Sequence, residues 1–179
     1  MLELEKTLLV LVDVQGTLAH LMHRKEDLFS NLRKIILGAQ ALGLPIVWLE
    51  QNPAGLGPTV PEIAELLGGG EPIPKYSFSG CGEERFLQVL NSLGRRQVLL
   101  AGIEAHVCVY QTAVDLAARG YEVQVVADAV SSRTPENREI GLEKMRGAGA
   151  SVTSVETALF ELVRVARGEV FKKLLAIVK

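Results

Sequence analysis

The sequence is poor in the residues that hold small secreted domains together. Its 179 residues include only two cysteines, Cys81 and Cys108, and aromatic residues make up 5% of the chain. Two cysteines are too few for a disulfide scaffold in a chain of this length. We therefore expect a reducing, cytoplasmic environment.

Long apolar runs are also missing. No run approaches the roughly 20 residues that a membrane-spanning helix needs. The acidic stretch 1–6 does not have the layout of a signal peptide. Because of these two absences, we expect no membrane partner.

The chain has no excess of basic charge. Lysine and arginine number 19 against 21 aspartates and glutamates, for a net charge of −2, so we expect no nucleic-acid partner. No G-x-G-x-x-G follows the first apolar run and no P-loop is present. This argues against a nucleotide-dependent enzyme, and we expect no cofactor.

The apolar residues, 48% of the chain, follow two patterns. Short continuous apolar runs predict buried strands, and apolar residues at helical spacing predict helices between them. The expected strands are residues 7–12, 45–49, 98–101, 122–127 and 150–153. The expected helices are residues 28–42, 61–67, 83–93, 106–119, 134–146, 155–167 and 169–178.

Strands that alternate with helices predict a three-layer α/β/α fold with a mostly parallel central sheet. Residues 1–179 form a single domain in this interpretation, with a C-terminal helical extension from about residue 168. The segment 72–80 is too rich in proline for a central strand.

Several chemically useful residues follow the expected strands. In open parallel sheets, ligands bind beyond the carboxyl ends of the strands. Asp13, Glu50, Cys108 and Asp128 all fall at that edge. Taken alone, Asp13 is equally well explained as a cap for the next turn, and Lys75 as an ordinary surface lysine.

Cys108 follows its strand where a helical pattern begins. The N–H groups of a first helical turn lack partners, and the helix dipole favours a negative charge there. We therefore predict that the pKa of Cys108 is lowered and that its thiolate is a nucleophile. The alternative is an inert structural cysteine, since cysteines are often buried.

His106 is a rival base for Cys108. Residues two apart on a helix point to different sides, so His106 should not face the Cys108 sulfur. We expect His106 to be a pocket or capping residue.

Together, Asp13, Lys75 and Cys108 resemble the catalytic triad of the isochorismatase-like cysteine hydrolases. The similarity covers most of the chain and is carried by residues 9–15, 74–79, 101–109 and 127–133. The resemblance implies a Rossmann-like fold and assigns a role to each residue of the triad. Asp13 is the general base, Lys75 stabilises the thiolate and keeps Asp13 ionised, and Cys108 attacks a carbonyl carbon to form an acyl-enzyme.

The same resemblance implies a non-proline cis peptide bond between Ile103 and Glu104. It also implies an oxyanion hole made by the backbone N–H groups of Glu104 and Cys108. The candidates for contact with the substrate are Gln15, Gln51, Phe78 and His106.

The nicotinamidase branch of the family adds a metal site after the second strand, built from an aspartate and histidines. Residues 49–57 contain no histidine here, so we expect no metal and place the chain in the compact, metal-independent branch. The branch that cleaves a vinyl ether does not rely on this cysteine. Retention of Cys108 favours hydrolysis of a small-molecule amide, another C–N bond or an ester, through a thioester-type acyl-enzyme.

Two other functions stay open. One is a catalytically silent, oligomeric interaction module that retains the fold, against which the intact Asp13, Lys75 and Cys108 argue. The other is a thiol redox protein using Cys81 and Cys108, against which the lack of a C-x-x-C argues.

A stripe of apolar residues at helical spacing runs through residues 170–178. It either packs within the chain or covers a partner subunit. We expect a homo-oligomer, at least a dimer.

Overall fold

The centre of the molecule is a six-stranded, all-parallel sheet with the strand order β3-β2-β1-β4-β5-β6. The computed structural model describes residues 1–179. Its strands are β1 (Thr7–Val12), β2 (Ile46–Gln51), β3 (Ile73–Lys75), β4 (Gln97–Ile103), β5 (Glu122–Ser131) and β6 (Ser151–Thr153). Every strand predicted from an apolar run is confirmed; β1 has the expected ends and the others are shifted at one or both ends.

The two central strands are the most apolar. Every residue of β1 and of β4 is buried, as expected for parallel strands covered on both faces. The short strand β3 was not predicted. It lies at the edge of the sheet, where the missing N–H of Pro74 removes no ladder hydrogen bond.

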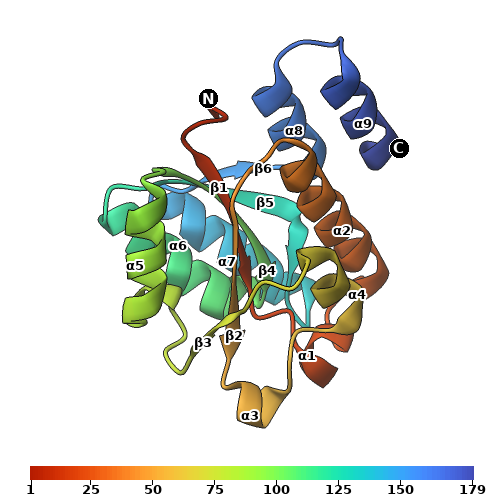
Figure 1. Cartoon of the computed structure of the whole chain (residues 1–179). Coiled ribbons are helices and arrows are strands. Elements are labelled where there is room, and N and C mark those ends of the chain that lie inside the picture. Colours follow the sequence, from red (N-terminus) through yellow and green to blue (C-terminus); the bar gives the residue numbers. More distant parts are fainter.

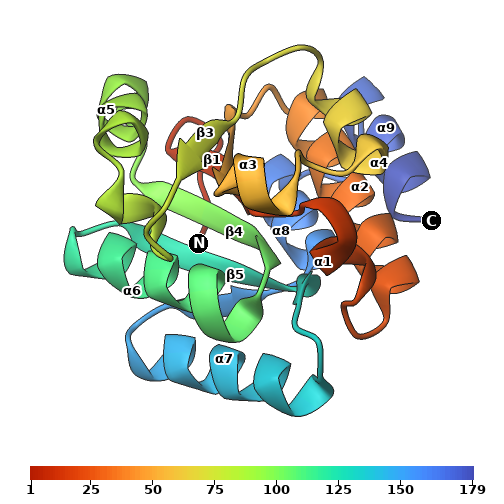
Figure 2. The same ribbon diagram turned by 90° about the horizontal axis from the view of Figure 1, so that it is seen from below.

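Helices cover both faces of the sheet, as Figure 1 and the view from below in Figure 2 show. One face packs against α1 (Gly16–His20), α2 (Lys25–Ala41), α4 (Pro61–Ala64), α8 (Val155–Val163) and α9 (Glu169–Val178). The other packs against α5 (Glu84–Leu93), α6 (Tyr110–Ala118) and α7 (Pro135–Gly147). The predicted three-layer α/β/α fold is confirmed, and its sheet is entirely parallel.

Several short elements were not predicted from the sequence. These are α1, α3 (Pro53–Leu56) and the single turn η2 (Gly80–Gly82), while η1 (Glu65–Leu67) continues α4. The helix expected over 106–119 begins as the π-helical turn η3 (Ala105–Val109) and continues as α6. The helix expected over 155–167 ends at Val163, because Arg164 adopts the left-handed conformation with φ 57°. No helix is both long enough and apolar enough to cross a bilayer.

The C-terminal helix α9 lies beside α2 and α8 (Figure 1). Leu174 is fully buried, and the rings of Phe160 and Phe171 lie 6.1 Å apart. Lys34 on α2 donates a hydrogen bond to the carbonyl of Val178 at 3.0 Å. The apolar stripe of α9 therefore packs largely within the chain.

The strand order reverses on either side of β1, whose neighbours are β2 and β4. Such a reversal is the position at which open α/β sheets bind ligands, beyond the carboxyl ends of the strands. Val12 pairs with Gly102 at these ends. The segments that follow, Asp13 from β1 and the η3 turn from β4, thus lie next to each other.

Candidate active site

Asp13 occupies a sharp turn directly after β1. Its φ of 52° is in the left-handed region, and its N–H donates to the carbonyl of Leu49 on β2 at 3.1 Å. The residue is only 3% exposed. The turn holds the Asp13 carboxylate inside the protein at the end of the sheet.

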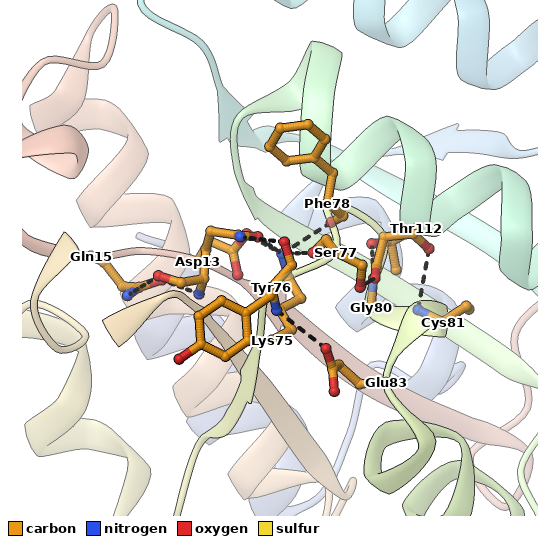
Figure 3. A network of polar contacts seen from close by, with 12 residues as sticks. Asp13, Gln15, Lys75, Tyr76, Ser77, Phe78, Gly80, Cys81, Glu83 and Thr112 are labelled. Carbon is orange, nitrogen blue, oxygen red and sulfur yellow. Dashed lines mark hydrogen bonds and ion pairs between the residues drawn. The ribbon is translucent and has the colours of Figure 1, made fainter. Parts of the chain in front are cut away.

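Lys75 ends β3 and is fully buried. Its ammonium donates to four oxygens: Asp13 Oδ2 at 2.7 Å, Gln51 Oε1 at 2.6 Å, and the carbonyls of Ser77 at 3.2 Å and Phe78 at 3.0 Å. Figure 3 shows the lysine beside Asp13 and the 77–78 backbone. A buried cation is tolerated only when it is paired and hydrogen-bonded in this way.

Cys108 lies in η3, a five-residue π-helical turn that precedes the regular helix α6. The residue is 8% exposed. Asp13 and Lys75 are the charged groups that act on the pKa of its thiol. Residues from β1, β3 and η3, far apart in the sequence, therefore meet at one point.

The prediction of a lowered Cys108 pKa is wrong. Burial, followed by the negative charge of Asp13, raises the pKa of the Cys108 thiol to about 12, and Lys75 only partly opposes this. Desolvation disfavours a thiolate and outweighs the effect of the helix terminus at this position. The thiol of the free protein is protonated at neutral pH.

The Asp13 carboxylate has one occupied and one vacant oxygen. Oδ2 accepts from Lys75, whereas Oδ1 is buried without a hydrogen-bond partner. Burial raises the pKa of Asp13, and the nearby Lys75 ammonium works against that rise. Oδ1 is thus a buried acceptor with no assigned donor, beside a thiol that carries a proton.

Polar contacts join the start of the η3 segment to the chain after β5. Glu104 Oε1 accepts from Arg133 Nε at 3.1 Å, and His106 Nδ1 lies 3.0 Å from Ser132 Oγ. The second contact directs His106 toward Ser132. The Ile103–Glu104 peptide bond, which precedes η3, is cis, as the resemblance implies.

Gln15 and Gln51 are already engaged with the protein. Gln15 is fully buried, donates to the carbonyls of Gln51 at 3.0 Å and Gly57 at 2.7 Å, and accepts from the Gln51 N–H at 2.6 Å. The Gln51 side chain accepts from Lys75 and donates to the carbonyl of Tyr76 at 2.9 Å. Sequence reasoning missed this network because its partners are backbone groups.

Two aromatic side chains stand beside the cluster with much of their surface exposed. Phe78 is 54% exposed and Tyr76 is 73% exposed. In Figure 3 the Phe78 ring points away from the Lys75 network, while its carbonyl faces Lys75. The backbone of this segment is fixed by the buried lysine, and its rings are available to a ligand.

The second cysteine is separate from the cluster. Cys81 and Cys108 are both free thiols. The Cys81 side chain points away from Asp13 and Lys75 in Figure 3, and burial raises its pKa to about 11. No group of three or more His, Cys, Asp and Glu side chains is arranged to hold a metal ion.

Comparison with known sequences identifies relatives over most of the chain. The profile of the Isochorismatase domain matches residues 7–157. Isochorismatase domain-containing protein 1 of Danio rerio is 40% identical over 153 residues, which are 86% of this chain and 54% of that protein. The secreted isochorismatase effector Isc1 of Phytophthora sojae is 38% identical over 178 residues, covering 97% and 84%. The chain spans about half the length of the Danio rerio protein.

Solved structures match nearly the whole chain. The MAR1 ribonuclease of Caenorhabditis elegans superposes with a TM-score of 0.92 at 35% identity, covering 99% of this chain and 91% of that one. YcaC of Pseudomonas aeruginosa, solved with hexane-2,5-diol and covalent acrylamide, gives 0.93 at 25% identity over 99% and 89%. YcaC of Escherichia coli, described as an octameric hydrolase of unknown specificity, gives 0.92 at 24% identity over 98% and 88%.

The profile match, the sequence relatives and the shared fold agree with the four segments of resemblance noted in the sequence. The chain belongs to the isochorismatase domain family and has its hydrolase fold.

Proposed function

We propose that the protein is a cysteine hydrolase that cleaves an amide, another C–N bond or an ester of a small molecule. Cys108 is the nucleophile, Asp13 the general base and Lys75 the group that holds Asp13 in place. The observation that carries this proposal is the buried Asp13 carboxylate, with Oδ2 bonded to Lys75 and Oδ1 lacking a donor. A catalytic base needs such an open acceptor beside the proton it removes.

The raised pKa of Cys108 is compatible with this assignment. The thiol keeps its proton until substrate binds, and Asp13 Oδ1 then accepts that proton as Sγ attacks the carbonyl carbon. Lys75 carries the positive charge that balances the developing thiolate. The thiol is activated by an adjacent base and need not be ionised in the resting protein.

The remaining steps need no further reactant than water. Asp13 returns the proton to the leaving nitrogen or oxygen, the bond to the leaving group breaks, and a Cys108 thioester remains. Water then attacks the thioester while Asp13 accepts its proton, and the C–S bond breaks. Asp13 gives that proton to the Cys108 sulfur, so the acid is released and the free thiol is restored. The backbone N–H groups of Glu104 and Cys108 are the proposed donors to the tetrahedral oxyanion.

The proposed contacts with the substrate are made by three side chains near the cluster, Gln51, Phe78 and His106. Gln15 has a different proposed role, because it is fully buried and its amide bonds only to Gln51 and Gly57, whereas Gln51 is partly exposed. It positions the loop that carries Gln51, and it does not touch the substrate.

We also propose that the chain forms a homo-oligomer. The description of the Escherichia coli YcaC fold relative as octameric supports this, whereas the packed α9 stripe does not add to it. Light scattering at micromolar concentration is expected to give a mass of at least a dimer. A clean monomer mass would remove the proposal.

RNA is not the proposed substrate, although the Caenorhabditis elegans relative is called a ribonuclease. A net charge of −2 gives no general attraction for a polyanion.

We propose a reducing, cytoplasmic location for the protein, which its two free thiols support.

The test combines turnover with thiol labelling. A library of small amides and esters is assayed, and the rate of labelling by acrylamide is followed at each cysteine by peptide mass spectrometry. Cys108 is expected to react faster than Cys81, the buried free thiol of the same chain, and more slowly in Asp13→Asn and Lys75→Ala. Equal Cys108 rates in all three proteins, with no turnover, would favour the silent interaction module.

A further inference from the structure

A second carboxylate, Glu50, lies at the same end of the sheet as Asp13 without a part in the chemistry above. Val12 of β1 pairs with Leu49 of β2, so Asp13 and Glu50 are the next residues along two adjacent parallel strands. Neighbouring strands lie about 4.8 Å apart. The Asp13 N–H donates to the carbonyl of Leu49, immediately before Glu50, at 3.1 Å.

The Glu50 side chain is buried and held by one residue of the following loop. It is 6% exposed, and its Oε1 accepts both the N–H of Thr59 at 2.6 Å and the Thr59 hydroxyl at 2.7 Å. These two bonds fix the Glu50 side chain near the carboxyl end of β2, on the strand next to the one that Asp13 follows.

We propose that Glu50 is a positioning residue that acts through Asp13. The negative charge of Glu50 makes Asp13 a stronger base toward the thiol of Cys108. This inference rests on the proposed function. Lys75 is the single buried cation, and its ammonium bonds to Asp13 and to Gln51, the residue after Glu50. The positive charge of Lys75 makes Asp13 a weaker base, and the buried Glu50 carboxylate on the adjacent strand offsets part of that effect.

The groups that act on Asp13 come from three neighbouring elements. They are Lys75 from β3, Cys108 from η3 and Glu50 from β2. Glu50 raises the pKa of Asp13, in the direction opposite to Lys75. Burial also raises the pKa of Asp13 and remains when the Glu50 charge is removed. Loss of that charge takes away the other influence that opposes Lys75, so Asp13 loses its proton at lower pH and accepts one less readily.

The competing role for Glu50 is to fasten the loop at Thr59, without an influence on Asp13. The variant Glu50→Gln separates these roles, because the amide oxygen of glutamine still accepts both Thr59 donors while the charge is gone. The exposed Glu62→Gln removes the same charge elsewhere and is the matched control. Glu50→Asp and Glu50→Asn form a second pair of equal size that differs only in charge.

The experiment measures the second-order rate constant of Cys108 alkylation by iodoacetamide as a function of pH, by mass spectrometry. Glu50→Gln is expected to move the acidic limb of this profile down by about half a pH unit or more. Its rate above the limb falls, because a weaker base removes the thiol proton less readily. Glu62→Gln and Glu50→Asp should keep the limb in place, and Glu50→Asn should shift it as Glu50→Gln does.

Two outcomes overturn the inference and are distinguishable. If folded Glu50→Gln has the limb of the natural protein, Glu50 only fastens the loop, and the proposed function stands. If Glu50→Gln does not fold, the Asp and Asn variants give the same comparison. If the limb persists in Asp13→Asn, Asp13 does not govern Cys108, and the proposed function fails together with the inference.

Discussion

Lys75 Nζ lies 2.7 Å from Asp13 Oδ2, and the side chains of both residues are almost completely buried. The two residues are 62 positions apart and belong to strands separated by β2. Burial of this ion pair removes both charges from water, so each charge depends on the other. The geometry of the candidate site and the stability of the fold are therefore linked at one contact.

Lys75→Ala should destabilise the protein strongly. Loss of one partner from a buried ion pair costs about 3–5 kcal/mol, because the remaining charge stays buried without compensation. The free energy of unfolding is measured by urea denaturation. Lys172→Ala is the control, since the Lys172–Glu169 pair has a similar N–O distance of 2.9 Å but is exposed to solvent, where pairs contribute about 0–1 kcal/mol. Equal losses of unfolding free energy in Lys75→Ala and Lys172→Ala would contradict the burial of Lys75.

Alkaline pH should destabilise the protein through Cys108. The thiol titrates near 9 when unfolded and at about 12 when folded, so between these values the folded state binds more protons than the unfolded state. The free energy of unfolding therefore falls as pH rises from 9, by up to about 1.4 kcal/mol per pH unit from this group.

Cys108→Ser removes that titration and should flatten the decrease. Urea denaturation at pH 8, 9 and 10 compares the two proteins, with Cys81→Ser as the matched variant at a thiol whose pKa is raised less, to about 11. Parallel curves for the natural protein and Cys108→Ser would show that the folded state does not hold the thiol proton.

Gly141→Ala should disturb the η3 turn from the side of α7. A Cβ at Gly141 would lie 2.5 Å from the carbonyl oxygen of Ala105 and 2.8 Å from the nitrogen of His106. Such overpacking costs about 1–3 kcal/mol, and displacement of η3 should lower the labelling rate of Cys108. Gly147→Ala on the same helix meets no atom within 4 Å. It should retain the labelling rate and the stability, and a similar loss in both variants would exclude the contact as the cause.

Gln15→Leu should loosen the loop that carries Gln51. It leaves the Gln51 N–H and the carbonyls of Gln51 and Gly57 without their partner. Each buried unsatisfied group costs about 1–3 kcal/mol. Gln88→Leu removes an exposed amide that bonds Glu84 on the same helix and should change stability by less than about 0.5 kcal/mol. Thermal unfolding of both variants is the measurement, and an unchanged midpoint for Gln15→Leu would contradict this role.

Local patterns were sufficient for most of the fold. The apolar run of β1 and the helical spacing of α2 depend on residues close together in the sequence, and both elements are where they were expected. Strand β3 was missed because three residues around Pro74 have no apolar pattern of their own, and pairing with β2 makes them a strand. The similarity of the segments around Asp13, Lys75 and Cys108 also sufficed to place the chain in its family.

The sequence by itself determined the layered fold, the family and the three residues that meet at the sheet edge, because these follow from local spacing and from short segments. Only the tertiary structure decided the protonation of Cys108, the engagement of Gln15 and the burial of Glu50 on the strand next to Asp13. Desolvation and hydrogen bonding depend on which groups from distant segments share a buried space. A helix terminus by itself lowers the pKa of a thiol. Here burial beside the Asp13 carboxylate raises the pKa of Cys108 instead.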